Sequence, residues 1–325
     1  MKMRRLGRTG PEVSALSLGA MALSDAYGKT DEAESLAVLH AAFDAGITMV
    51  DTGDFYGSGH NEMLIGEALK GRRDKLTVAV KFGAQRDPSG AFIGYDASPR
   101  AVKAGLAYTL KRLRTDYIDI YMPARVDPAV PIEDTVGAIA DCVKAGWVRH
   151  IGLSEASPQT VRRAVAIHPI AALQIEYSVV ERGPAEAVLP TLRELGVGMT
   201  AYGVLSRGLL KPDAALGGPG DLRAHMPRFA AGALEANRRL VAGLAEIAGD
   251  KGVSVPQLCI AWALSRGDDI VPLAGARTRA QLADALGALD VVITPEDAAR
   301  IDAAVPADAV AGERYPAAAM GQLNG

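Results

Sequence analysis

Three side chains that can act together in proton transfer lie close to the ends of two apolar segments. Asp51 and Lys81 each end an apolar run, and Tyr56 follows Asp51 in a loop that contains several glycines. An isolated phenol has a pKa of roughly 10 and releases its proton reluctantly at neutral pH. A lysine within about 4–6 Å lowers that pKa, and a carboxylate beside the lysine keeps the lysine charged. We therefore expect Tyr56 to be a general acid tuned by Lys81 and Asp51.

The spacing by itself leaves a second interpretation open, because such residues at strand ends are often solvated or form ordinary ion pairs. The elements around them decide whether they can meet. Apolar strands and helical patterns alternate along the whole chain. We predict strands at residues 13–18, 47–51, 76–81, 117–122, 148–154, 171–177, 197–202 and 269–273.

The helices predicted between these strands include 60–70, 132–144, 157–167, 184–195 and 278–288, and Thr30 and Ser98 are the expected caps of two others. This alternation, with short connections, predicts a parallel sheet covered by helices. Eight such units in 325 residues favour a closed (β/α)8 TIM barrel, as a single domain over 1–325. In a parallel barrel the carboxyl ends of all strands lie on one side, so Asp51 and Lys81 would share that side.

Additional segments are expected at both ends of the barrel. The turn at 6–10 predicts an N-terminal β-hairpin that closes the lower end. Residues 83–97 and 203–233 are long insertions, and the second is rich in proline and glycine. Loops of this kind on the C-terminal face of a barrel usually shape its site.

Composition limits the classes of function. The chain is 49% hydrophobic and carries a formal net charge of −3, which argues against a nucleic-acid partner. Cys142 and Cys259 lie in apolar helical patterns and are predicted to be buried free thiols. No apolar run is long enough to span a membrane, and the histidines lack the spacing of a metal site. We expect a cytoplasmic protein, a monomer or weak homo-oligomer, without a membrane partner.

An open dinucleotide-binding sheet is the alternative architecture, and it requires the pattern G-x-G-x-x-G after an early strand. The nearest match begins at Gly57 and Gly59, but Glu62 occupies the place of the third glycine. The glycine-rich run 217–220 follows no predicted strand. A dinucleotide would have to be held in another way.

The segments 51–57 (Asp-Thr-Gly-Asp-Phe-Tyr-Gly) and Val80-Lys81 resemble the active-site segments of the aldo-keto reductases. These are nicotinamide-dependent oxidoreductases built on a (β/α)8 barrel. The resemblance extends from the N-terminal hairpin through the last barrel helix. It implies NADPH-dependent reduction of a small aldehyde or ketone to an alcohol, with Tyr56 as the proton donor.

The resemblance also implies a set of cofactor contacts. Ser154 and Gln174 would bind the nicotinamide amide, Tyr202 would stack on its ring, and the loop 203–210 would wrap the pyrophosphate. Arg277 would hold the 2′-phosphate, although a solvated charge at a helix start is the alternative, and Arg207 can equally be a surface charge. The full set is Gly19, Met21, Asp51, Ser154, Gln174, Tyr202, Ser206, Gly208, Leu210, Gly275, Arg277, Gln281 and Asp284.

Three positions depart from the family pattern, one of them Ala285, where the family often has an asparagine that contacts the adenine. The fourth strand of the family normally ends Gln-His-Arg-x-Asp, and here Ala124 stands in place of the histidine. Arg125 is expected to point away from the site, because adjacent strand residues point to opposite sides. Glu155 follows Ser154, where the family often has asparagine.

With a triad in place of a tetrad, we expect activated carbonyls to be the better substrates. The missing histidine also supports another hypothesis, a nicotinamide-binding sensor or regulatory protein with weak catalysis. A barrel enzyme with unrelated chemistry is disfavoured by Gln174, Tyr202 and Arg277.

Overall fold

Eight parallel strands form a closed barrel in the computed structural model, which describes residues 1–216, 218 and 220–323. Around the barrel their order is β10-β11-β12-β3-β4-β5-β8-β9, so each strand pairs with the next barrel strand in the chain and the last closes on the first. The predicted (β/α)8 barrel is confirmed. The strands are β3 (Ser17–Gly19), β4 (Met49–Gly53), β5 (Thr77–Phe82), β8 (Ile118–Pro123), β9 (Val148–Ser154), β10 (Ile170–Glu176), β11 (Gly198–Tyr202) and β12 (Ile270–Ala274).

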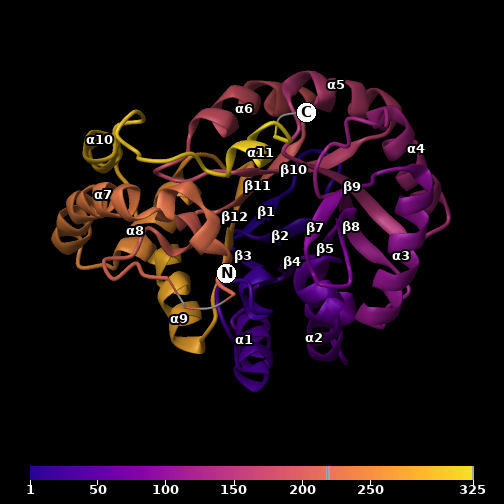
Figure 1. Ribbon diagram of the computed structural model, residues 1–325, viewed down its shortest axis with the longest axis horizontal. Helices are drawn as coiled ribbons and strands as arrows, with labels where there is room; N and C mark the ends of the chain where they lie inside the picture. The colour runs from indigo at the N-terminus through magenta and orange to yellow at the C-terminus, as the bar shows by residue number, and fades with distance from the viewer. Residues whose placement is uncertain (217, 219, 324–325) are drawn as a thin grey trace.

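Helices cover the outside of the barrel (Figure 1). They are α1 (Glu32–Asp44), α2 (His60–Ala68), α3 (Pro99–Leu113), α4 (Ile132–Lys144), α5 (Pro158–Ile167), α6 (Gly183–Leu195), α7 (Ala231–Asp250), α8 (Val255–Ser265) and α9 (Arg279–Gly287). The chain continues into α10 (Pro295–Ala304), which packs against α7, and ends with the short α11 (Ala317–Met320). In the described residues, no helix combines the length and the apolar character needed to span a membrane.

The first predicted strand, 13–18, is wrong as a single element. Its first part belongs to β2 (Glu12–Ser14) of the N-terminal hairpin, and its second part begins β3 of the barrel. The Ser14 hydroxyl donates to the Leu16 carbonyl at 2.7 Å, and the Ser14 backbone N–H donates to the Thr48 hydroxyl. These bonds hold a bend between two extended segments that share one apolar pattern.

Helix caps explain two of the boundaries. Thr30 does not cap α1; Asp31 does, because its carboxylate accepts from the Glu34 backbone N–H at 2.8 Å, while the Thr30 hydroxyl bonds Asp25. A carboxylate is the stronger acceptor at a helix N-terminus. Ser98 caps α3 as predicted, with proline in the first turn.

The N-terminal hairpin closes the lower end of the barrel, as predicted. Strand β1 (Met3–Arg5) pairs antiparallel with β2. Leu6 and Val13 from this hairpin are fully buried in one cluster with barrel residues such as Met49 and Ile120. This cluster fills the barrel interior from below, so only the opposite end can hold a polar site. The two cysteines are buried and unpaired, as expected.

Both insertions contain short ordered elements. The first holds an antiparallel hairpin, and the second contains several 3-10 turns, while Gly217 and Pro219 in it lie outside the described residues. After α10, the chain returns across the barrel strands to α11 (Figure 1). The hairpin strands are β6 (Ala84–Arg86) and β7 (Phe92–Tyr95), and the 3-10 turns of the whole chain are η1 (Ala20–Leu23), η2 (Tyr56–Gly59), η3 (Arg73–Lys75), η4 (Ser206–Gly208), η5 (Leu222–His225), η6 (Pro227–Phe229) and η7 (Ala288–Asp290).

Candidate active site

A buried lysine–aspartate pair lies inside the barrel. Lys81 on β5 forms an ion pair with Asp51 on β4, and both side chains are about 5% exposed or less. The Gln174 amide on β10 donates to the other Asp51 oxygen at 2.7 Å. Because β4 and β10 are not neighbours, this bond crosses the barrel interior. Asp51 is therefore fixed from two sides and orients the Lys81 ammonium.

Tyr56 lies next to this pair. Its ring centroid is 5.1 Å from the Lys81 Nζ. The turn that carries it is tight: Gly57, Ser58 and Gly59 all have positive φ, at +55°, +52° and +96°. Glycine adopts this conformation freely, whereas Ser58 adopts it at a cost. The turn thus returns Tyr56 to the barrel mouth, and the structure brings the predicted trio together.

The net direction of the Tyr56 pKa is opposite to the expected one. The pKa of Tyr56 is raised well above its ordinary value, first by burial and next by Asp51. The cations that lower it are Arg125 and Arg207. Burial likewise lowers the pKa of Lys81, and Asp51 opposes that change. Withdrawal from water disfavours the charged form of each group and exceeds the local charge effects.

Ala124 and Arg125 follow β8, which ends at Pro123. The Ala124 methyl is buried, and its backbone N–H donates to the Phe82 carbonyl at 2.8 Å. The prediction that Arg125 points away is wrong. Strand alternation applies to residues within a strand, and Arg125 lies beyond its end. The guanidinium bends over the barrel mouth, where Nη1 contacts the Ser154 hydroxyl at 3.4 Å.

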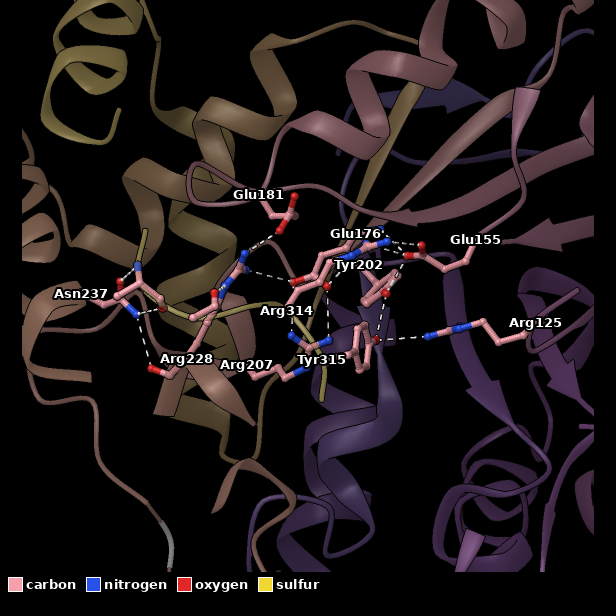
Figure 2. A network of polar contacts seen from close by, with 12 residues as sticks. Arg125, Glu155, Glu176, Glu181, Tyr202, Arg207, Arg228, Asn237, Arg314 and Tyr315 are labelled. Atoms are coloured by element: carbon pink, nitrogen blue, oxygen red, sulfur yellow. Dashed lines mark hydrogen bonds and ion pairs between the residues drawn. The ribbon is translucent and has the colours of Figure 1, made fainter. Parts of the chain in front are cut away.

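A network of buried charges surrounds this mouth and was missed by sequence reasoning (Figure 2). The fully buried Glu155 pairs with Arg314 at 2.7 Å, and the fully buried Glu176 pairs with Arg207 at 3.2 Å. Arg207 is therefore part of an internal ion pair and is not a surface charge. The unusual Glu155 was the one signal in the sequence. Its backbone also has φ +53°, a conformation in which asparagine is less strained.

The C-terminal segment contributes Tyr315 to the same network. Its hydroxyl is 2.9 Å from the Tyr202 hydroxyl and accepts from Arg125 Nη2 at 3.1 Å. The Tyr202 hydroxyl donates to Glu155 at 2.7 Å. Figure 2 shows Tyr315 between Arg125 and Tyr202. A segment near the end of the chain therefore helps to build the site at the strand ends.

The loop expected to wrap a pyrophosphate is compact. Its 3-10 turn η4 uses backbone N–H groups internally: Gly208 donates to Leu205 at 2.8 Å, and Leu210 donates to the same carbonyl at 3.3 Å. Ser206 is fully buried, and within the described part of the chain its hydroxyl has no hydrogen-bond partner. Such an orphaned hydroxyl is uncommon in a protein interior.

The residues expected at the adenosine end already have protein partners. The Arg277 guanidinium donates to the Tyr27 carbonyl at 2.9 Å and to the Lys29 carbonyl at 2.5 Å. The Gln281 side chain accepts from the Arg277 backbone N–H, and Asp284 accepts from the Ser254 hydroxyl. Arg277 is thus partly buried, and its hydrogen bonds hold the segment after η1.

The remaining predicted cofactor residues lie between these two regions. Gly19 ends β3, and Met21 lies in the partly buried turn η1 that follows it. A Cβ added at Gly275 would be 3.8 Å from the Gly19 carbonyl oxygen, so the two glycines lie side by side. The predicted set therefore runs from the centre of the barrel mouth to its edge at β3 and β12.

A sequence model described as the aldo/keto reductase family matches residues 15–306. The chain belongs to this family. It is 42% identical over 323 residues to a protein named probable aldo-keto reductase 1 from Glycine max, with 96% of this chain and 91% of that protein covered.

Solved structures agree with this assignment. A glycerol dehydrogenase from Gluconobacter oxydans is 26% identical, with a TM-score of 0.83 and coverage of 93% of this chain and 94% of that one. The holo form of an aldo-keto reductase from Bacillus halodurans is 28% identical, with a TM-score of 0.76 and coverage of 94% and 97%. The protein is an enzyme of the oxidoreductase class with the aldo/keto reductase barrel.

Two features of the barrel mouth are compatible with a bound nicotinamide cofactor. The buried Ser206 hydroxyl needs an acceptor that no described residue supplies. Ser154 and Gln174 pair across β9 and β10 in register, and Gln174 points into the barrel, so Ser154 faces the same interior.

A partly buried carboxylate, Asp54, lies next to the turn that carries Tyr56, and it predicts a pH effect on stability. The pKa of Asp54 is raised to about 7, first by burial and next by Glu62, whereas the unfolded value is 3.8. The folded protein is therefore most stable, as far as Asp54 is concerned, below pH 3.8, where this carboxyl is protonated in both states. That stability is lost as the pH rises through about 7, because the folded protein then has to hold the charged form. We expect Asp54→Asn to raise the melting temperature of this aldo/keto reductase at about pH 8.

Thermal unfolding of both proteins from about pH 4 to pH 8 measures this effect, because the advantage of Asp54→Asn should shrink toward the acid end. An advantage that is the same at every pH would contradict the prediction. Asp116→Asn is the matched control, since Asp116 lies just before β8, at the amino end of that strand, and is exposed.

Proposed function

We propose that the protein reduces an aldehyde or ketone to an alcohol with NADPH, with Tyr56 as the proton donor and Lys81 and Asp51 as its support. The observation that carries the proposal is the buried Lys81–Asp51 pair, held by Gln174, with the Tyr56 ring 5.1 Å from Lys81 Nζ. A partly exposed phenol beside a buried ammonium–carboxylate pair suits general acid catalysis at a carbonyl oxygen.

Each residue of the trio has a separate task. A bound NADPH would supply the hydride for the carbonyl carbon. Tyr56 donates its proton to the oxygen, which becomes more basic as negative charge develops on it. Lys81 stabilises the resulting phenolate, because an opposite charge nearby favours the ionised form. Asp51 orients Lys81 and balances its charge within the barrel.

Protein groups at several points of the mouth are suited to holding the cofactor. Ser154 and Gln174 offer polar groups to the nicotinamide amide, and Tyr202 offers an aromatic ring. Ser206, with Gly208 and Leu210, offers the pyrophosphate a buried hydroxyl that no described residue uses. Arg277 is proposed for the 2′-phosphate, with Gln281 and Asp284 beside it. Guanidinium groups suit phosphate because they can donate two parallel hydrogen bonds.

Cofactor preference gives a direct test of Arg277. We expect Arg277→Ala to weaken NADPH binding about ten- to a hundredfold, because a hydrogen bond between charged groups contributes roughly 1.5–3 kcal/mol. NADH binding should change far less. Fluorescence titration with both cofactors measures the two dissociation constants.

Arg279→Ala is the matched control for this test, because Arg279 is two positions along and pairs on the surface with Glu34 at 2.9 Å. Because Arg277 also holds the carbonyls of Tyr27 and Lys29, an equal loss of NADPH and NADH affinity would assign it a purely structural role. Equal affinity of the unmutated protein for both cofactors would also overturn the assignment.

A second candidate is a nicotinamide-binding regulatory or sensor protein with weak catalysis, and Ala124 is the observation that favours it. Loss of absorbance of NADPH on incubation with a reactive aromatic aldehyde separates the two functions. Turnover supports the reductase. Tight NADPH binding without turnover on any aldehyde supports the sensor.

The proposed partner is a small carbonyl compound, with no nucleic acid or membrane involved. The proposed setting is the cytoplasm, where the two buried thiols stay reduced. A monomer or weak homo-oligomer is expected, and sedimentation at several concentrations measures the assembly.

A further inference from the structure

The place where a second hydrogen-bond donor is expected, position 124, carries only a buried methyl group. We propose that Arg125 supplies this donor, so that its guanidinium and the Tyr56 hydroxyl both contact the carbonyl oxygen of the substrate. The inference rests on the proposed reductase function and identifies a further catalytic residue of that site.

The position of the Arg125 guanidinium is the first support. Nη1 donates to the Ala124 carbonyl at 2.7 Å, so the side chain folds back over its own backbone and lies where residue 124 ends. Nη1 also reaches the inward-facing Ser154 hydroxyl at 3.4 Å, and Nη2 reaches Tyr315 at 3.1 Å. These contacts place the cation at the inner rim of the barrel mouth.

The effect of the Arg125 charge on two neighbouring pKa values agrees with this placement. Arg125 lowers the pKa of Tyr56 and also lowers the pKa of Lys81. The same cation therefore acts on both the proposed proton donor and the lysine that supports it.

The charge balance is the second support. Arg207 and Arg314 each pair with a fully buried glutamate. Among the described residues, no carboxylate lies within ion-pair distance of Arg125, which is held by a carbonyl and two hydroxyls. A partly buried cation without a counter-ion is costly. It is also suited to stabilise negative charge that develops on an oxygen in the transition state.

The third support is the way in which Arg125 is held. Tyr315 bonds both Arg125 and Tyr202, and its ring lies 4.6 Å from the Arg207 guanidinium carbon. The neighbouring Arg314 fixes the segment through Glu155. Tyr315 is thus a positioning residue, because it acts on the substrate only through Arg125. Preorganised donors of this kind avoid the cost of reorganisation during the reaction.

The test uses benzaldehydes with para substituents of increasing electron demand, at saturating NADPH. We expect Arg125→Gln to lower kcat about a hundred- to a thousandfold, the usual cost of removing a donor to a developing oxyanion. The rate should also depend more steeply on the substituent, because an electron-withdrawing group then has to replace the lost polarisation. The dissociation constant of NADPH should change less than about threefold.

Arg125→Lys keeps the charge but loses the forked geometry of the guanidinium. Its kcat and substituent dependence should therefore fall between those of the wild type and those of Arg125→Gln. Tyr315→Phe removes the hydroxyl that holds Nη2, and its substituent dependence should shift in the same direction by a smaller amount. These two variants carry the test if Arg125→Gln does not fold. Arg149→Gln is the matched control, since Arg149 stacks on Tyr117 at the surface, and it should behave as wild type.

A histidine introduced at position 124 tests whether Arg125 takes the role of the second hydrogen-bond donor. Ala124→His should raise kcat of Arg125→Gln by a larger factor than it raises kcat of the wild type, because the second donor is missing only in the former. An equal factor in both backgrounds would contradict the proposal.

The possible failures are distinguishable. If the wild type reduces no aldehyde, the proposed function and this inference are both overturned. If the wild type is active and Tyr56→Phe is inactive, but Arg125→Gln keeps its kcat and substituent dependence, only the role of Arg125 is overturned.

Discussion

Tyr56→Phe is expected to lower kcat about a hundred- to ten-thousandfold, the usual contribution of a positioned general acid. The substitution removes one hydroxyl and keeps the ring that packs at 4.8 Å against Phe55. NADPH affinity and the melting temperature should therefore stay close to those of the wild type. Stopped-flow or steady-state kinetics with a reactive aldehyde, together with a fluorescence titration of NADPH, measure both effects.

Tyr108→Phe is the matched control, since the Tyr108 side chain is 65% exposed on α3 and its loss should change nothing. The raised pKa of Tyr56 adds a second expectation. Because the phenol keeps its proton through the neutral range, kcat should not fall between about pH 6 and pH 9. Normal turnover of Tyr56→Phe would refute the mechanism.

Lys81→Met is expected to abolish most turnover and also to destabilise the fold. It removes the cation that supports the phenolate and leaves Asp51 buried without a counter-ion. Breaking a buried pair in this way costs about 3–5 kcal/mol. Kinetics and thermal unfolding of the same preparation separate the two losses.

The double variant Asp51→Asn with Lys81→Met further separates the loss of turnover from the loss of stability. An asparagine at 51 can still accept from Gln174, and no charge is then buried alone. We expect most of the stability to return while turnover stays low. Lys251→Met is the matched control, because Lys251 pairs with Asp297 of α10 at 2.7 Å, far along the chain from the trio. Its loss should affect stability without affecting kcat. Restored turnover in the double variant would show that Lys81 serves only the fold.

The sequence alone was enough to predict the barrel and the trio. Apolar strands that alternate with helices have one stable arrangement, and the carboxyl ends of parallel strands then lie on the same side. Asp51 and Lys81 share that side because each lies in the carboxyl-terminal part of the apolar run that precedes it, although β4 runs on to Gly53 and β5 to Phe82. Tyr56 had to lie near them because it is only three residues beyond Gly53, the last residue of β4. These relations depend on local pattern and on strand direction.

Other features depended on the tertiary structure. The bond between Gln174 and Asp51 joins residues 123 positions apart, and the pair Glu155–Arg314 joins residues 159 apart, so no local pattern contains them. Beyond the end of β8, the direction of Arg125 is set by Ser154 and Tyr315, whereas strand alternation would have turned it away. The raised pKa of Tyr56 likewise follows from burial. How far a group is withdrawn from water depends on everything packed around it, and only the assembled fold determines that.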